Sequence, residues 1–129
     1  MSETRSYNPW IGRVLTALPT AAFLASGTMK LMGGADGLKM FVEKFGYPAS
    51  ALAPIGAVEL TCAALYAIPR TSALGAVLLT GYLGGAVATH VRVGDPFVAP
   101  VIFGVVVWAG LYFRDARVRA VLPLRAPAD

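Results

Sequence analysis

The sequence predicts an all-α integral membrane protein that folds as one domain over residues 1–129, a four-helix bundle with antiparallel up-down topology. Hydrophobic residues make up 57% of the chain and charged residues only 14%, whereas a soluble domain usually has about 25% charged residues. The charges are also unevenly placed. Four long stretches contain no charged residue other than Glu59: Val14–Met29, Phe45–Pro69, Thr71–Val91 and Pro96–Phe113.

The first membrane span is predicted at residues 11–32, close to the length of about 20 residues that crosses the hydrocarbon of a bilayer. The connection that follows, GGADGLKMFVEKFGYPAS, is the longest in the chain. Its apolar residues recur at helical spacing, with charged residues between them. This pattern predicts a short amphipathic helix at about residues 36–45, lying in the outer membrane interface.

The second and third spans are predicted at residues 51–68 and 71–91, with the sequence IPRT forming a tight turn between them. The fourth span is predicted at 96–113 and follows a second tight turn, VGDP. Small residues recur on the third span, at Gly75, Gly81, Gly84, Gly85 and Ala88. Since small residues allow membrane helices to approach closely, we expect this span to pack against its neighbours through them.

Basic residues flank the spans unequally, which predicts the orientation. With four spans both termini lie on one side, and seven basic residues lie there against four on the other side. The positive-inside rule therefore places both termini in the cytoplasm. The seven are Arg5, Arg13, Arg70, Arg114, Arg117, Arg119 and Arg125, and the four are Lys30, Lys39, Lys44 and Arg92.

Five polar residues are predicted to meet on the outer half of the bundle and to form a ligand-binding site. Lys30 ends the first span on the outer side, and His90 and Arg92 end the third span there. Glu59 lies about 12 Å below that surface, at 1.5 Å per helical residue, and Tyr82 lies at a similar depth. An ionisable side chain at this depth is costly, so it marks a functional site by default.

The chemistry of these residues leaves alternatives open. Glu59 and His90 are candidate catalytic residues, acting as an acid and base pair, but Glu59 can equally tie two helices together. His90 can instead be a structural group or an axial haem ligand. A closed zinc site needs three or four suitable ligands, and the chain has one histidine and one cysteine, Cys62. We therefore expect no metal site and an inert thiol at Cys62.

The net charge of +4 does not predict nucleic-acid binding, because the basic residues flank apolar spans and form no basic patch with aromatic residues. The protein's expected partners are instead the lipid bilayer, a small lipophilic ligand, a second copy of the chain and a membrane redox protein. Four short helices without inverted repeats argue against a transporter.

Three stretches of the sequence resemble the DoxX-like family of small bacterial integral membrane proteins. They are SGTMKL, GAVELTCAALYAIPRTSALGAVLLTGYLGGAVATHVRVGDP and GLYFRDARVRAVLPLR, and the resemblance runs from about Trp10 to Arg125. It implies a four-helix bundle in the bacterial inner membrane, with Lys30, Glu59, Tyr82, His90 and Arg92 at polar positions typical of the family. The broader superfamily includes a subunit of a thiosulfate:quinone oxidoreductase, so a quinone is a candidate cofactor.

Three functions remain as hypotheses. The first is a protein that binds a small lipophilic molecule or quinone in a polar pocket within the bundle, as a subunit of a membrane redox system. The second is an assembly or scaffold protein without chemistry, in which the polar cluster fixes the helix register. The third is a small membrane enzyme that uses Glu59 and His90. The sequence leaves open whether the protein is an enzyme.

Overall fold

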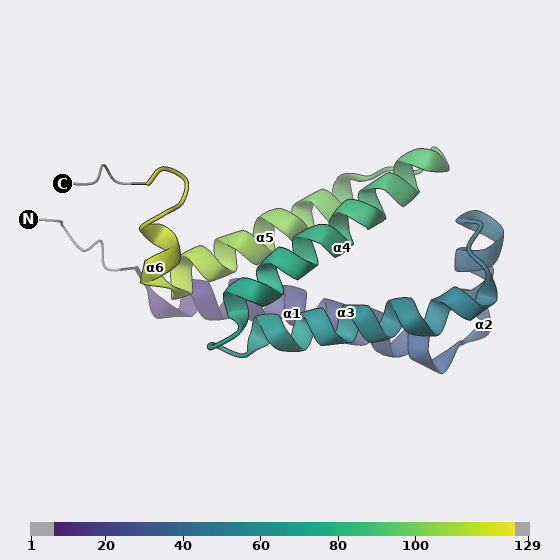
Figure 1. Ribbon diagram of the computed structural model, residues 1–129, viewed down its shortest axis with the longest axis horizontal. Helices are drawn as coiled ribbons and strands as arrows, with labels where there is room; N and C mark the ends of the chain where they lie inside the picture. Colours follow the sequence, from purple (N-terminus) through teal and green to yellow (C-terminus); the bar gives the residue numbers. More distant parts are fainter. Residues whose placement is uncertain (1–6, 126–129) are drawn as a thin grey trace, which may run out of the picture.

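The computed structural model describes residues 7–125, and this part of the chain is all-helical, with no strand. The elements in chain order are α1 (Pro9–Met32), α2 (Ala35–Lys39), the π-helix η1 (Met40–Lys44), the 3₁₀-helix η2 (Ala49–Ala51), α3 (Leu52–Ala67), α4 (Ser72–Arg92), α5 (Val98–Arg114) and α6 (Ala116–Arg119). The four long helices are α1, α3, α4 and α5, and Figure 1 shows short helical segments at both ends of the molecule.

The four long helices begin and end within two residues of the predicted spans. Three of them, α1, α4 and α3 with the preceding η2, are long and apolar enough to cross a membrane, whereas α5 is a shorter apolar helix of 17 residues. The protein is therefore a multi-pass membrane protein by the length and composition of its helices. Arg5, which entered the orientation argument, lies outside the described residues.

Local sequence explains where these helices start. α1 begins with Pro9 after Asn8, whose side chain accepts a hydrogen bond of 3.0 Å from the Trp10 amide. Pro54 and Pro100 lie in the first turns of α3 and α5. The first turn of a helix tolerates proline because its N–H groups have no partner within the helix.

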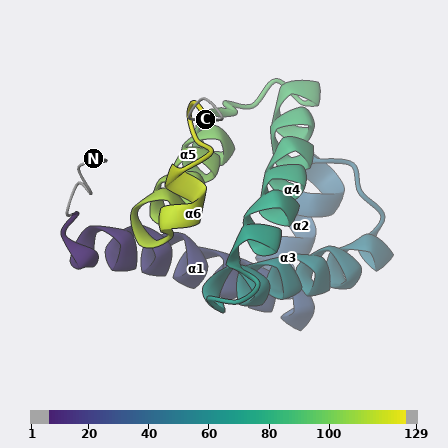
Figure 2. The same ribbon diagram turned by 60° about the vertical axis from the view of Figure 1, so that its left-hand side comes forward.

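The four long helices pack in a ring, in which α1 and α4 each contact both α3 and α5. Figures 1 and 2 show that the start of α1, the end of α5 and the α3–α4 turn gather at one end, which we call the terminal end. The opposite end, which carries α2 and η1, is called the cavity end. The largest fully buried side chains include Tyr66, Leu79, Val107 and Leu111, and they form one hydrophobic core with the buried residues around them.

Glycines set two of the helix contacts. At the α1–α3 crossing, a Cβ on Gly56 would lie 2.8 Å from the carbonyl oxygen of Gly27. At the α3–α4 contact, a Cβ on Gly75 would lie 2.2 Å from the backbone nitrogen of Tyr66. The expectation of close packing at Gly75 is thus confirmed, because only a residue without a side chain fits there.

The same expectation is wrong for Gly81, Gly84 and Gly85. A Cβ at any of the three would have no other atom within 4 Å. Gly84 lines a shallow groove on the outer face of α4 and α5, while Gly81 and Gly85 face a cavity inside the ring. Small residues on a membrane helix therefore mark open space here as well as helix contact.

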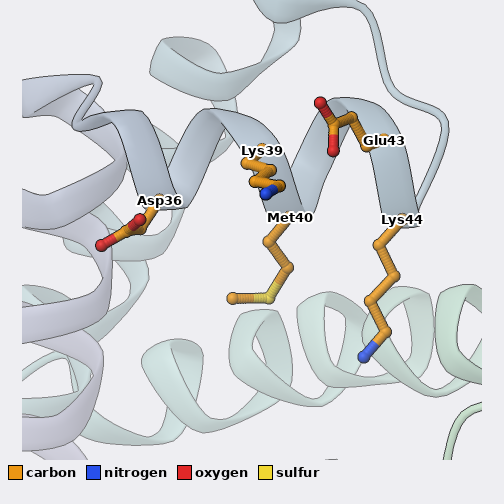
Figure 3. A pocket seen from close by; sticks show the side chains of 5 residues that line it. All are labelled: Asp36, Lys39, Met40, Glu43 and Lys44. Carbon is orange, nitrogen blue, oxygen red and sulfur yellow. The ribbon is translucent and has the colours of Figure 1, made fainter.

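The connection between α1 and α3 is helical from Ala35 to Lys44, where the sequence predicted a helix at 36–45, but its second half is a π-helix. Figure 3 shows the side chains that line a hollow at this segment, which are Asp36, Lys39, Met40, Glu43 and Lys44. Met40 and Lys44 extend to one side of the segment and Glu43 to the other (Figure 3). We call residues 35–47 the covering segment.

A short helix that the sequence did not predict, α6, follows α5. Asp115 caps it by accepting a hydrogen bond of 2.9 Å from the Arg117 amide, and its carboxylate also accepts from the Arg117 side chain. The hydrogen bond from the Arg117 guanidinium lowers the pKa of the Asp115 carboxyl below its ordinary value.

Candidate ligand-binding cavity

A cavity of about 550 Å³ lies inside the ring of helices at the cavity end. Its walls come from all four long helices and from the covering segment, which contributes Met40, Phe41, Phe45 and Tyr47. Most of the lining is apolar or aromatic, and the polar side chains that join it are Ser26, Lys30, Glu59, Tyr82, Thr89 and His90. The cavity thus has the size and the character of a small-molecule site: a concave apolar surface with a few converging polar groups.

Lys30 and Glu59 form an ion pair at this cavity. The Lys30 Nζ donates to Glu59 Oε2 at 2.6 Å and to Ser26 Oγ at 2.6 Å. The two side chains are only 12% and 3% exposed. A pair so enclosed is held by strong charge interaction, because little water screens it.

The glycine contact described above explains why these two charges meet. Gly27 lies three residues before Lys30 on α1, and Gly56 lies three residues before Glu59 on α3. Residues three apart lie on the same face of a helix. The close crossing of the two glycines therefore brings the charged side chains of the next turn within hydrogen-bonding distance.

Tyr82 lies on α4 beside this ion pair. Its phenol is close enough to the Glu59 carboxylate for the two groups to interact electrostatically, and its ring packs edge-on against Phe23 with centroids 6.4 Å apart. The predicted equal depth of Glu59 and Tyr82 thus corresponds to neighbouring positions in the structure.

His90 lines the cavity nearer its mouth. Its Nδ1 lies 2.7 Å from the carbonyl oxygen of Ala86, and its ring lies 5.3 Å from that of Phe45. The neutral tautomer that donates from Nδ1 satisfies this carbonyl and leaves Nε2 as an acceptor. His90 forms no hydrogen bond or salt bridge with Glu59, since about 12 Å of helical rise separates it from the level of Tyr82.

Arg92 does not line the cavity. Its guanidinium donates to the carbonyl oxygen of Phe45 and lies 5.9 Å from the centre of the Tyr47 ring. Two other contacts hold the covering segment to the end of α4: the Tyr47 and Thr89 hydroxyls lie 2.7 Å apart, and Lys44 pairs with Asp95 at 2.8 Å. Arg92 therefore anchors the cover of the cavity from outside.

We expect Arg92→Gln to loosen the covering segment while the helices stay folded. A hydrogen bond from a charged donor contributes about 1.5–3 kcal/mol, so its loss should speed amide exchange in residues 41–47 by about tenfold or more. Hydrogen-exchange mass spectrometry of the detergent-solubilised protein measures this directly. Lys39→Gln, at an exposed position of the same segment, is the matched control. Equal exchange in both variants would contradict the anchoring role.

Within residues 7–125 no group of three or more His, Cys, Asp or Glu side chains is placed to hold a metal ion. Cys62 is a buried free thiol that packs in the hydrophobic core. The polar chemistry of the cavity thus comes from one ion pair, one histidine and several hydroxyl groups.

Sequence reasoning missed several cavity residues. Phe41 and Phe45 belong to the segment predicted as an interfacial amphipathic helix, and Tyr47 follows it, but all three line the cavity. The repeated spacing of a glycine three residues before Lys30 and before Glu59 was a usable signal for the ion pair.

Several helices within residues 7–125 are long and apolar enough to span a bilayer, which is the character of a multi-pass membrane protein. These helices enclose the ion pair at the lined cavity. The sequence profile of the DoxX-like family matches residues 14–110. The chain therefore belongs to the DoxX-like family, which confirms the resemblance seen in the sequence. Searches of curated proteins and of solved structures found no match.

Proposed function

We propose that this DoxX-like protein binds one small lipophilic molecule in the cavity, with the polar head of the molecule toward Lys30, Glu59 and Tyr82. The observation that carries the proposal is the cavity itself, about 550 Å³ in volume and lined by aromatic and apolar side chains around a buried ion pair. Ligand sites of small molecules have volumes of about 300–1,000 Å³ and the same mixture of surfaces.

The proposed setting is the bacterial inner membrane, with the four long helices as an antiparallel bundle and both termini in the cytoplasm. The excess of basic residues at the terminal end supports this orientation. The covering segment then lies at the outer interface, where the exposed charges of Asp36, Lys39 and Glu43 face water.

The lining supports a ligand with a flat ring and hydrogen-bond acceptors. Phe23, Phe41, Phe45 and Phe103 present aromatic surface, and Lys30 and Tyr82 carry donors beside it. A quinone head has this chemistry: a flat ring with carbonyl oxygens at its edge. A role as subunit of a membrane redox system follows if the molecule is a quinone.

The other two hypotheses have less support. A scaffold protein needs the ion pair but has no need of a lined cavity. An enzyme that uses Glu59 and His90 on the same reacting atom requires the two groups to meet, and about 12 Å of helical rise separates their levels. Binding of a small lipophilic molecule is consistent both with the lined cavity and with the separation of Glu59 from His90.

Two neighbouring glycines provide the test. Gly85 faces the cavity and Gly84 faces outward, and a Cβ meets no atom within 4 Å at either position. We expect Gly85→Leu to fill part of the cavity and to weaken binding at least about tenfold, while Gly84→Leu binds normally. Both substitutions favour the helix, so neither should unfold the protein.

The measurement has two parts. Mass spectrometry of the protein purified in mild detergent identifies co-purifying molecules and their ratio to protein, and a titration with a short-chain ubiquinone analogue gives an affinity. If Gly85→Leu keeps the same molecule at the same ratio as Gly84→Leu, the cavity is not the binding site. If a lipophilic molecule co-purifies but the protein does not bind the ubiquinone analogue, the quinone hypothesis is contradicted. The cavity then remains the proposed binding site for another lipophilic molecule.

A further inference from the structure

A second hollow lies at the terminal end, on the outer surface between α1, α3 and α5, and it is separate from the ligand cavity. Its volume is about 420 Å³. It has a basic end and an apolar remainder. The lining residues are Arg13, Thr16, Ala17, Thr20, Ala21, Leu24, Ala67 and Arg114.

The basic end contains one buried donor without a partner, the Nε of Arg114. The Thr16 side chain also lines this end and lies close enough to the Tyr66 hydroxyl to interact with it. The rest of the Arg114 side chain is held in place, because its Nη2 donates to the Tyr66 carbonyl oxygen at 2.5 Å and its guanidinium lies 4.6 Å from the Tyr66 ring centre. Arg114 lines the hollow, and its guanidinium has more N–H donors than this one hydrogen bond uses. A ligand with acceptor oxygens would therefore be stabilised there.

Charge favours an anion at the same place. Arg13 stands beside these donors, with its guanidinium 5.1 Å from the centre of the Trp10 ring. Among residues 7–125 neither Arg13 nor Arg114 has a salt-bridge partner. Two arginines without a salt bridge suit a phosphate group, since arginine donates to several phosphate oxygens at once.

The remainder of the hollow suits a hydrocarbon chain. Ala17, Ala21 and Leu24 follow one another at helical spacing along α1, away from Arg13, and Ala67 lies on the α3 side. Thr20 presents little polarity, because its hydroxyl donates to the Thr16 carbonyl oxygen at 2.7 Å. From Arg13 to Leu24 the helix rises by about 16 Å, about half of the hydrocarbon thickness.

We propose that this hollow binds one anionic phospholipid, with its phosphate on Arg13 and Arg114 and one acyl chain along Ala17, Ala21 and Leu24. A free phosphate would use the basic end alone, whereas a phospholipid uses both ends. Basic pockets between membrane helices on the cytoplasmic side bind anionic lipid headgroups in this manner.

The test is a native mass spectrometry titration of the delipidated, detergent-solubilised protein with three probes. They are phosphatidylglycerol, phosphatidylcholine with the same acyl chains, and glycerol 3-phosphate, which has the headgroup phosphate but no chains. We expect phosphatidylglycerol to bind at least about tenfold more tightly than phosphatidylcholine, and glycerol 3-phosphate to compete weakly. Equal affinity for the two lipids would overturn the proposal, and strong competition by glycerol 3-phosphate would replace it with a free-phosphate site.

Variants separate this hollow from general attraction to a basic surface. Arg13→Gln should weaken phosphatidylglycerol binding about fivefold, since one basic residue contributes about 1 kcal/mol, while Arg13→Lys keeps most of the affinity. Arg70→Gln removes the same charge from an exposed position in the α3–α4 turn and should have no effect. If Arg13→Gln and Arg70→Gln lose equal affinity for phosphatidylglycerol, the lipid binds by general attraction to a basic surface. That result would overturn the proposed site.

A substitution in the apolar half tests the acyl chain. Ala21 is exposed, so Ala21→Leu fills the hollow without disturbing the core and should weaken phosphatidylglycerol binding several-fold. Unchanged binding by Ala21→Leu would show that no chain lies there. Far-ultraviolet circular dichroism checks that each variant is folded. If Ala21→Leu does not fold, the effect of Arg13→Gln on phosphatidylglycerol binding still tests the proposed site.

Discussion

Gly75→Ala is expected to be among the most damaging single substitutions in the protein, although it adds only one methyl group. The added Cβ would lie 2.2 Å from the backbone nitrogen and 2.4 Å from the Cα of Tyr66. These atoms belong to the backbone of α3, so they cannot move aside as a flexible side chain can. The α3–α4 pair must separate, and we expect a loss of at least about 3 kcal/mol in stability.

Thermal unfolding in mild detergent measures this effect as a drop in Tm. Gly84→Ala is the matched control, because it adds the same methyl group to the same helix where no atom lies within 4 Å. Alanine favours a helix over glycine by about 1 kcal/mol, so the control should be neutral or slightly stabilising. A Tm for Gly75→Ala equal to that of the control would mean that α3 and α4 are not in such close contact.

Lys30→Met and Glu59→Leu are each expected to destabilise the protein by about 3–5 kcal/mol, because each leaves one buried charge without its partner. The double variant should recover much of this loss, since two apolar side chains at an enclosed site need no counter-charge. The pair is 2.6 Å apart and nearly inaccessible to solvent, which is the geometry in which strong coupling is expected.

A double-mutant cycle on Tm in detergent tests the ion pair directly. Additive losses in the double variant would show that Lys30 and Glu59 do not depend on each other. The same three variants also inform the proposed function. If the double variant is stable but no longer retains a small molecule, the charges act on the ligand as well as on the fold.

The helix positions could be predicted from the sequence because their causes are local. Long stretches without charge, closed by proline and by short turns, determine where a membrane helix begins and ends. The convergence of Lys30, Glu59, Tyr82 and His90 on one cavity could be anticipated as well. Depth along a helix follows from simple counting, so residues at equal depth were candidates for contact.

The remaining features depend on which face of a helix meets which neighbour, and this information is not local. Gly75 and Gly85 lie on the same helix and look alike in sequence, yet one contacts α3 and the other faces the cavity. Arg92 was expected in the site because of its depth, but its long side chain reaches outward to the covering segment. Tyr47 directly follows the predicted interfacial helix in the sequence, but it lines the cavity.

The uneven placement of the packed core has a consequence for which positions of this chain tolerate change. The buried side chains of the core include Tyr66 and Leu111 near the terminal end, whereas Gly81, Gly85 and Ala86 line open space toward the cavity end. Substitutions at Gly81, Gly85 and Ala86 should therefore cost little folding free energy, whereas those at the Lys30–Glu59 pair cost more. The proposed ligand cavity can be reshaped at these three positions while the helices keep their packing, which makes it a suitable starting point for engineering new ligand preferences.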